Sequence, residues 1–107
     1  MVFVWLKSGS RVYVDRIMRK LPVDRVHLGN PIQAAKVDDS TGRRQVLLQT
    51  NDGHWETFDH AIFACHSDAT LEILRRGGNI LPDEEHLLSK FQWNKNGAVL
   101  HTDNRVQ

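Results

Sequence analysis

The first clear periodicity in the chain is helical and lies between Ser10 and Pro22. The hydroxyl of Ser10 can cap a helix, and Pro22 cannot continue one. Between them apolar side chains recur at helical spacing, at Tyr13, Val14, Ile17, Met18 and Leu21. Basic residues lie toward the C-terminal end of this segment, at Arg16, Arg19 and Lys20. The pattern predicts one helix.

Shorter segments that favour strands follow, separated by turn residues. They are residues 25–28, 32–37, 45–50 and 54–58. The polar stretch 38–42 and the sequence Asn51-Asp52-Gly53 separate the last three, and Asn-Asp-Gly is typical of a hairpin turn. We therefore predict a three-stranded antiparallel meander over 32–58, preceded by a separate short strand at 25–28.

Residues Ala61–Cys65 form a continuous apolar run without alternation. Such a run is typical of a strand that is buried on both faces of a parallel sheet, and this strand would need neighbours on both sides. Two helices are predicted after it, one capped by Ser67 or Asp68 and ended by Gly77-Gly78, the other beginning at Pro82. Residues 98–101 are predicted as a last strand.

The composition fits one small domain. The chain has 107 residues, of which 40% are apolar and 25% charged, with a net charge of +1, so a basic nucleic-acid binder is not indicated. No apolar run approaches the roughly 20 residues that span a bilayer, and residues 1–6 lack the basic flank of a secretory signal. The single cysteine, Cys65, favours a reducing compartment. We expect a cytoplasmic protein without a nucleic-acid or membrane partner.

Local motifs for catalysis are weak. On a strand, Cys65 and His66 would point to opposite faces, so they would not form a nucleophile and base pair. The same geometry argues against a metal site built from His60, Cys65, His66 and Asp68, although a bent strand end could bring two of them together, and no metal is expected. The sequence contains no GxGxxG dinucleotide-binding motif.

Four blocks, taken in order, resemble a known family. They are residues 5–14 (WLKSGSRVYV), 30–32 (NPI), 58–68 (FDHAIFACHSD) and 98–103 (AVLHTD). Together they are similar to the flavin-containing amine-oxidase-like oxidoreductases that bind FAD or NAD(P). The family usually has two glycines before the serine, where this chain has Ser8-Gly9.

The resemblance implies the interior part of a longer, two-domain α/β flavoprotein whose dinucleotide-binding motif lies outside this chain. By this resemblance the 107 residues form one partial domain of the α+β class. It contains a helix, the meander with short strands of parallel type at 25–28 and 61–65, and two helices. Residues 1–80 would belong to the FAD-binding domain, and residues 81–107 would begin the substrate domain.

The resemblance also implies site residues. Ile32 matches the position where a strand meets the adenine ring of FAD, while Ala64, Cys65 and His66 match the strand end that leads to the flavin. Family members commonly place a lysine near the flavin, and Asn96 occupies that position here, with Lys95 adjacent.

A last candidate, His101, stands out in the AVLHTD block. With Asn96 it is a weak catalytic candidate beside the pocket for a small-molecule substrate.

Two functions follow. The first is a part of an FAD-dependent oxidoreductase that transfers a hydride from substrate to FAD, in which the 107 residues alone are inactive and bind FAD weakly or not at all. The alternative is a non-catalytic binding or interaction module. In either case an exposed apolar strand at 61–65 predicts self-association of the isolated chain.

Overall fold

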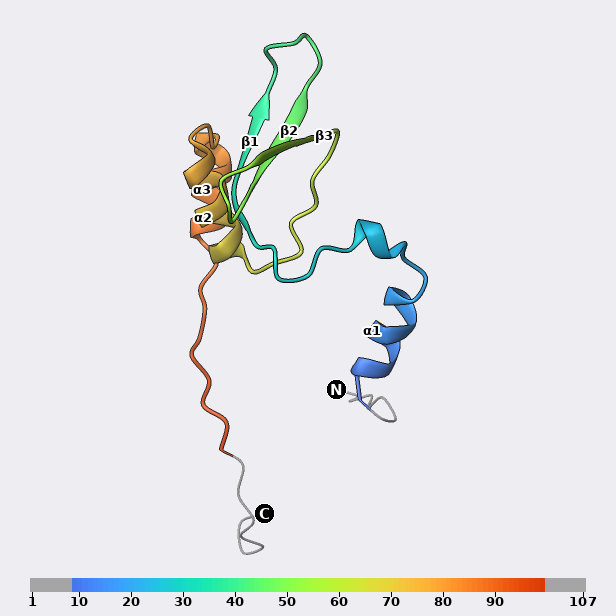
Figure 1. Cartoon of the computed structure of the whole chain (residues 1–107). Coiled ribbons are helices and arrows are strands. Elements are labelled where there is room, and N and C mark those ends of the chain that lie inside the picture. The colour runs from blue at the N-terminus through green and yellow to red at the C-terminus, as the bar shows by residue number, and fades with distance from the viewer. Residues whose placement is uncertain (1–8, 100–107) are drawn as a thin grey trace, which may run out of the picture. The chain divides into compact units, whose positions relative to one another are not determined.

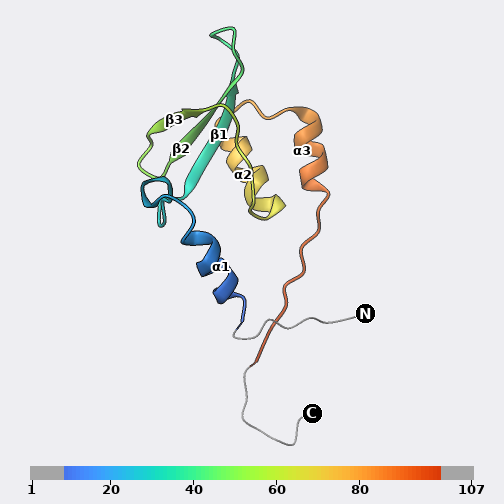
Figure 2. The same ribbon diagram turned by 90° about the vertical axis from the view of Figure 1, so that its right-hand side faces the viewer.

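The computed structural model describes residues 9–99. Residues 1–31 and 32–107 form two compact units, which are described separately. In Figure 1 the chain is coloured from its N-terminus to its C-terminus, and Figure 2 shows the same ribbon from the side. No helix in the described residues is both long and apolar enough to cross a membrane.

The first unit contains the predicted helix, α1 (Arg11–Met18), and a short 3₁₀ helix (Val23–Arg25). Ser10 occupies the capping position of α1, but its side chain makes no capping hydrogen bond. The strand predicted at 25–28 is wrong: Arg25 ends the 3₁₀ helix, and Leu28 is 84% exposed. An extended segment becomes a strand only when another strand pairs with it, and the described part of this unit offers none.

The second unit contains the predicted meander. Strands β1 (Ile32–Asp38), β2 (Gln45–Thr50) and β3 (Trp55–Phe58) form one antiparallel sheet in that order. A bulge interrupts the pairing of β1 with β2 between Ile32 and Ala34, which leaves Gln33 as the extra residue. The unit therefore has the α+β architecture that was predicted for the meander and its helices.

Two polar turns hold the strands together. In the β2–β3 turn, the Thr50 backbone N–H donates to the carbonyl of His54, the Thr50 carbonyl accepts from the N–H of Gly53, and Gly53 has a positive φ of 86°. The Thr50 hydroxyl and the His54 backbone N–H both donate to Asp52, and these bonds lower the pKa of the Asp52 carboxyl. Hydrogen bonds from Ser40 likewise lower the pKa of Asp38 in the turn between β1 and β2.

Helix α2 (Ser67–Gly77) packs on β1, and α3 (Pro82–Ser89) packs on α2, as Figure 2 shows. His66, rather than Ser67 or Asp68, is the capping residue of α2, and Gly78 ends the helix in the left-handed conformation, as predicted. Helix α3 begins with Pro82, and the Glu84 side chain accepts a hydrogen bond from the backbone N–H of Leu81.

The tightest contact in the unit joins the end of α2 to the backbone of β1. A Cβ atom added to Gly77 would lie 1.7 Å from the carbonyl oxygen of Ala35, so only glycine fits there. The apolar side chains that are buried in the described residues are Ala34, Ala35 and Leu71. Small residues on β1 and the glycine on α2 thus let the helix lie directly on the strand.

Within the described residues neither of the last two predicted strands forms. Residues 61–65 have no strand assignment, and neither do Ala98 and Val99, of which Val99 is 84% exposed. The remaining residues of the predicted last strand, including His101, lie outside the described residues. Ile62 is 94% exposed, although the apolar run predicted burial on both faces. The residues have the composition of a buried strand, but no described segment of the chain pairs with them, and only Ala61 and Phe63 are half-buried.

We expect Gly77→Ala to destabilise the second unit by about 3 kcal/mol, because the added methyl group forces α2 away from β1. Urea unfolding followed by circular dichroism measures this change. Gly97→Ala is the matched control, since no atom lies within 4 Å of a Cβ built there. It should change the stability by no more than about 0.5 kcal/mol. Equal stability of the two variants would contradict the close approach.

Candidate functional site

Ile32, Ala64 and Cys65 meet at a cavity on the face of the sheet that α2 covers. The cavity has a volume of about 440 Å³, within the range of small-ligand sites. Its lining combines the start of β1, one residue each from β2, β3 and α2, and the segment that joins β3 to α2: Ile32, Leu48, Phe58, His60, Ala61, Ile62, Phe63, Ala64, Cys65 and Ile73. Most of these side chains are apolar, so the cavity suits the flat, weakly polar part of a ligand.

Three of the four predicted cofactor residues line this cavity. Ile32 comes from the start of β1, and Ala64 and Cys65 come from the segment that precedes α2. The two segments are far apart in the sequence, so their convergence depends on how the meander turns back beneath α2. Leu48, Phe58 and Ile73 also line the cavity and were not singled out from the sequence. The alternation of apolar residues along the meander was the signal that could have indicated Leu48 and Phe58.

The fourth residue, His66, is not in the lining. Its ring stacks on the indole of Trp93, with the ring centroids 4.3 Å apart and the planes inclined by 12°. Trp93 Nε1 also donates a hydrogen bond to Ser67 Oγ, at 3.1 Å. The backbone carbonyl of His66 accepts hydrogen bonds from the backbone N–H and the hydroxyl of Thr70. In this arrangement His66 begins α2 and anchors the segment that follows α3.

The Cys65 thiol lies 3.2 Å from the hydroxyl of Thr70. Its hydrogen-bonding partner is therefore on the first turn of α2, and the His66 imidazole is engaged with Trp93 instead. Within residues 9–99 no group of three or more His, Cys, Asp or Glu side chains comes together in the way a metal site requires.

The catalytic candidates do not reach this cavity. Asn96 is exposed in the segment that follows α3 and has no part in the lining. His101 lies outside the described residues. The described residues therefore form an apolar surface for a ligand, and neither predicted catalytic residue is found in it.

The backbone of the segment 60–65 is an unusual feature of the site. Among the described residues, none forms a hydrogen bond with the backbone N–H or carbonyl groups of this segment. Nearby, the Arg43 side chain reaches Asp59 at 2.7 Å, so an ion pair fixes only the residue before the segment. An apolar segment with unpaired backbone groups can accept a strand from another chain.

Known proteins offer no comparison: no family, curated protein or solved structure that was searched matches this chain. The flavoprotein resemblance remains an interpretation of the sequence blocks.

We expect the purified chain to self-associate as its concentration rises, through the exposed segment around Ile62. Ile62→Lys should shift sedimentation toward the monomer, because a charge on the apolar segment opposes pairing. Val23→Lys is the matched control, since Val23 is 90% exposed but lies in the other unit. A wild-type chain that stays monomeric at high concentration would contradict this expectation.

Proposed function

We propose that this chain supplies the adenine-side wall of an FAD site in a cytoplasmic FAD-dependent oxidoreductase. The observation that supports the proposal is the convergence of Ile32, Ala64 and Cys65 on one apolar cavity. The sequence blocks assign Ile32 to the adenine ring and Ala64 and Cys65 to the strand end that leads to the flavin. Because all three residues line the same cavity, the proposal assigns all of them to the adenine. When bound, the flavin ring of FAD would accept a hydride from a small-molecule substrate.

The cavity suits an adenine ring better than a phosphate. Ile32, Ile73 and the two aromatic side chains Phe58 and Phe63 can pack against the faces of a planar base. The bulge at Gln33 lies beside Ile32. The extra residue in a bulge is left out of the strand pairing, so the backbone N–H and carbonyl of Gln33 can form hydrogen bonds with the edge of the base. The chain would bind and orient the adenine and exclude water from it.

The proposal assigns the pyrophosphate to another part of the parent protein. The sequence carries no GxGxxG motif, and that motif places backbone N–H groups against the phosphates. The isolated chain should therefore bind the adenine portion alone, and weakly.

A second candidate function is an interaction module without redox chemistry. The specific observation that favours it is the exposed Ile62 within a segment whose backbone is unpaired in the described residues. Such a module would bind an extended strand of a partner and would show no preference for adenine compounds.

The two candidate functions differ in their ligand, an adenine nucleotide or a protein strand. The NMR signals of the isoleucine methyl groups distinguish them. Ile32, Ile62 and Ile73 line the cavity, whereas Ile17 and Ile80 do not. We expect AMP and FAD to shift the NMR signals of the first three with dissociation constants of about 1 mM. FMN, which has the flavin but no adenine, should leave them unchanged.

Ile32→Asp should abolish these shifts, and Val23→Asp, in the other unit, should preserve them. Equal effects of FMN and AMP would contradict the adenine assignment. Tight, stoichiometric FAD binding by this chain would contradict the assignment of the pyrophosphate to another segment. No response to any of the three nucleotides would favour the interaction module.

A further inference from the structure

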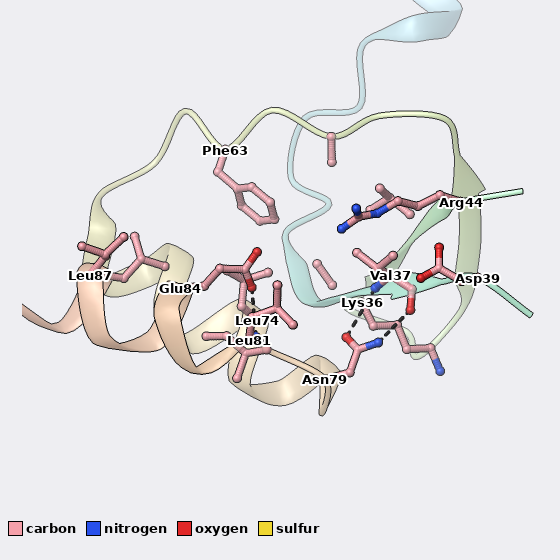
Figure 3. Close-up of a pocket in the computed structure, with 15 residues that line it drawn as sticks. Lys36, Val37, Asp39, Arg44, Phe63, Leu74, Asn79, Leu81, Glu84 and Leu87 are labelled. Atoms are coloured by element: carbon pink, nitrogen blue, oxygen red, sulfur yellow. Dashed lines mark hydrogen bonds between the residues drawn. The ribbon is translucent and has the colours of Figure 1, made fainter.

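A second and larger cavity lies on the other side of Phe63, between the sheet, the end of α2 and α3. Its volume is about 620 Å³. Figure 3 shows Phe63 above the cavity, Leu74, Leu81 and Leu87 along the helical side, and Val37 on the sheet. Ala61 and Phe63 line both cavities, so the segment 60–65 forms a wall that they share.

Most polar side chains of this second cavity are already engaged within the protein. The Asn79 side chain donates to the backbone carbonyl of Val37 at 2.7 Å and accepts from its N–H at 3.4 Å. Glu84 accepts the hydrogen bond that caps α3, at 3.1 Å from the Leu81 nitrogen. Lys36 Nζ lies 4.6 Å from the centre of the Trp55 ring, on the opposite face of the sheet.

Arg44 is different. In Figure 3 its guanidinium extends from the sheet into the space below the segment that carries Phe63, while the Asp39 carboxylate is set apart from it near Val37. Within residues 9–99 Arg44 forms no ion pair or side-chain hydrogen bond, whereas its neighbour Arg43 is paired with Asp59 at 2.7 Å. The cavity thus combines apolar walls with two exposed charged side chains, Arg44 and Asp39, and neither forms an ion pair or side-chain hydrogen bond within residues 9–99. Of these two groups only the guanidinium of Arg44 attracts an anion.

We propose that this cavity binds an amphipathic carboxylate, a small acid with an extended apolar body. The planar guanidinium of Arg44 can bind both oxygens of a carboxylate, which an isolated ammonium group cannot match. The apolar body lies between Phe63 and the leucines of α2 and α3, where its removal from water favours binding. Both contacts are needed, because either one alone is weak at a partly exposed site.

This inference does not depend on the adenine proposal, because it uses other residues and another ligand chemistry. Ile80 lines the carboxylate cavity and does not line the adenine cavity, where Ile32 and Ile73 lie. Binding at each cavity is therefore read from different methyl signals of the same labelled chain.

The test is a titration of the whole chain with three probes. Decanoate has both the carboxylate and the apolar body, 1-decanol lacks the charge, and acetate lacks the body. We expect decanoate to shift the Ile80 methyl signal, to bind about tenfold more tightly than 1-decanol, and to leave Ile32 and Ile73 unchanged. Acetate should produce no shift.

Two arginine variants complete the test. Arg44→Gln should weaken decanoate binding about tenfold, to the affinity of 1-decanol. Arg43→Gln removes a neighbouring charge of the same sign that is paired elsewhere, and it should leave decanoate binding unchanged. Equal binding of decanoate and 1-decanol, equal loss in both variants, or the absence of an Ile80 shift would overturn the proposal.

Discussion

Helix α2 can lie directly on strand β1 only because Gly77 carries no side chain where the helix meets the carbonyl of Ala35. The alanines of β1 are small for the same reason, since a larger residue would lift the helix from the strand. Asn79, two residues after the helix, then binds both backbone groups of Val37 and so pairs with the free edge of β1. This contact orients α2, and α3 in turn packs on α2.

The contact also explains why the unit has two cavities instead of a filled interior. It brings α2 against β1, but β2 and β3 are farther from the helix and gain no comparable cover in the described residues. The segment 60–65 crosses this uncovered face with half-buried Phe63 toward the sheet and Ile62 exposed. Unfilled apolar space and unpaired backbone groups are both costly to leave in contact with water. We therefore expect a further strand or a ligand to cover this face of the sheet.

Features that depend on neighbours in the sequence were predictable. The meander, the left-handed end of α2 at Gly78 and the start of α3 at Pro82 follow from turn residues and spacing. The strand predicted at 61–65 was wrong because a strand also needs a partner, which composition does not supply. The stacking of His66 on Trp93 joins residues 27 positions apart, and no local pattern indicates such a contact. For the site, the sequence blocks named Ile32, Ala64 and Cys65, while their shared cavity follows from the packing of α2 on β1.

Amide hydrogen exchange tests this account most directly, because it reports backbone pairing residue by residue. The slowest exchange should occur in the paired backbone of the central sheet and in α2, at Lys36, Leu48 and Leu71, and the amides of residues 61–65 should exchange at nearly the rate of an unfolded chain. Exchange must be followed at a protein concentration low enough to keep the chain monomeric. Strong protection of residues 61–65 under that condition, or rapid exchange at Lys36 and Leu71, would contradict the proposed organisation around Gly77.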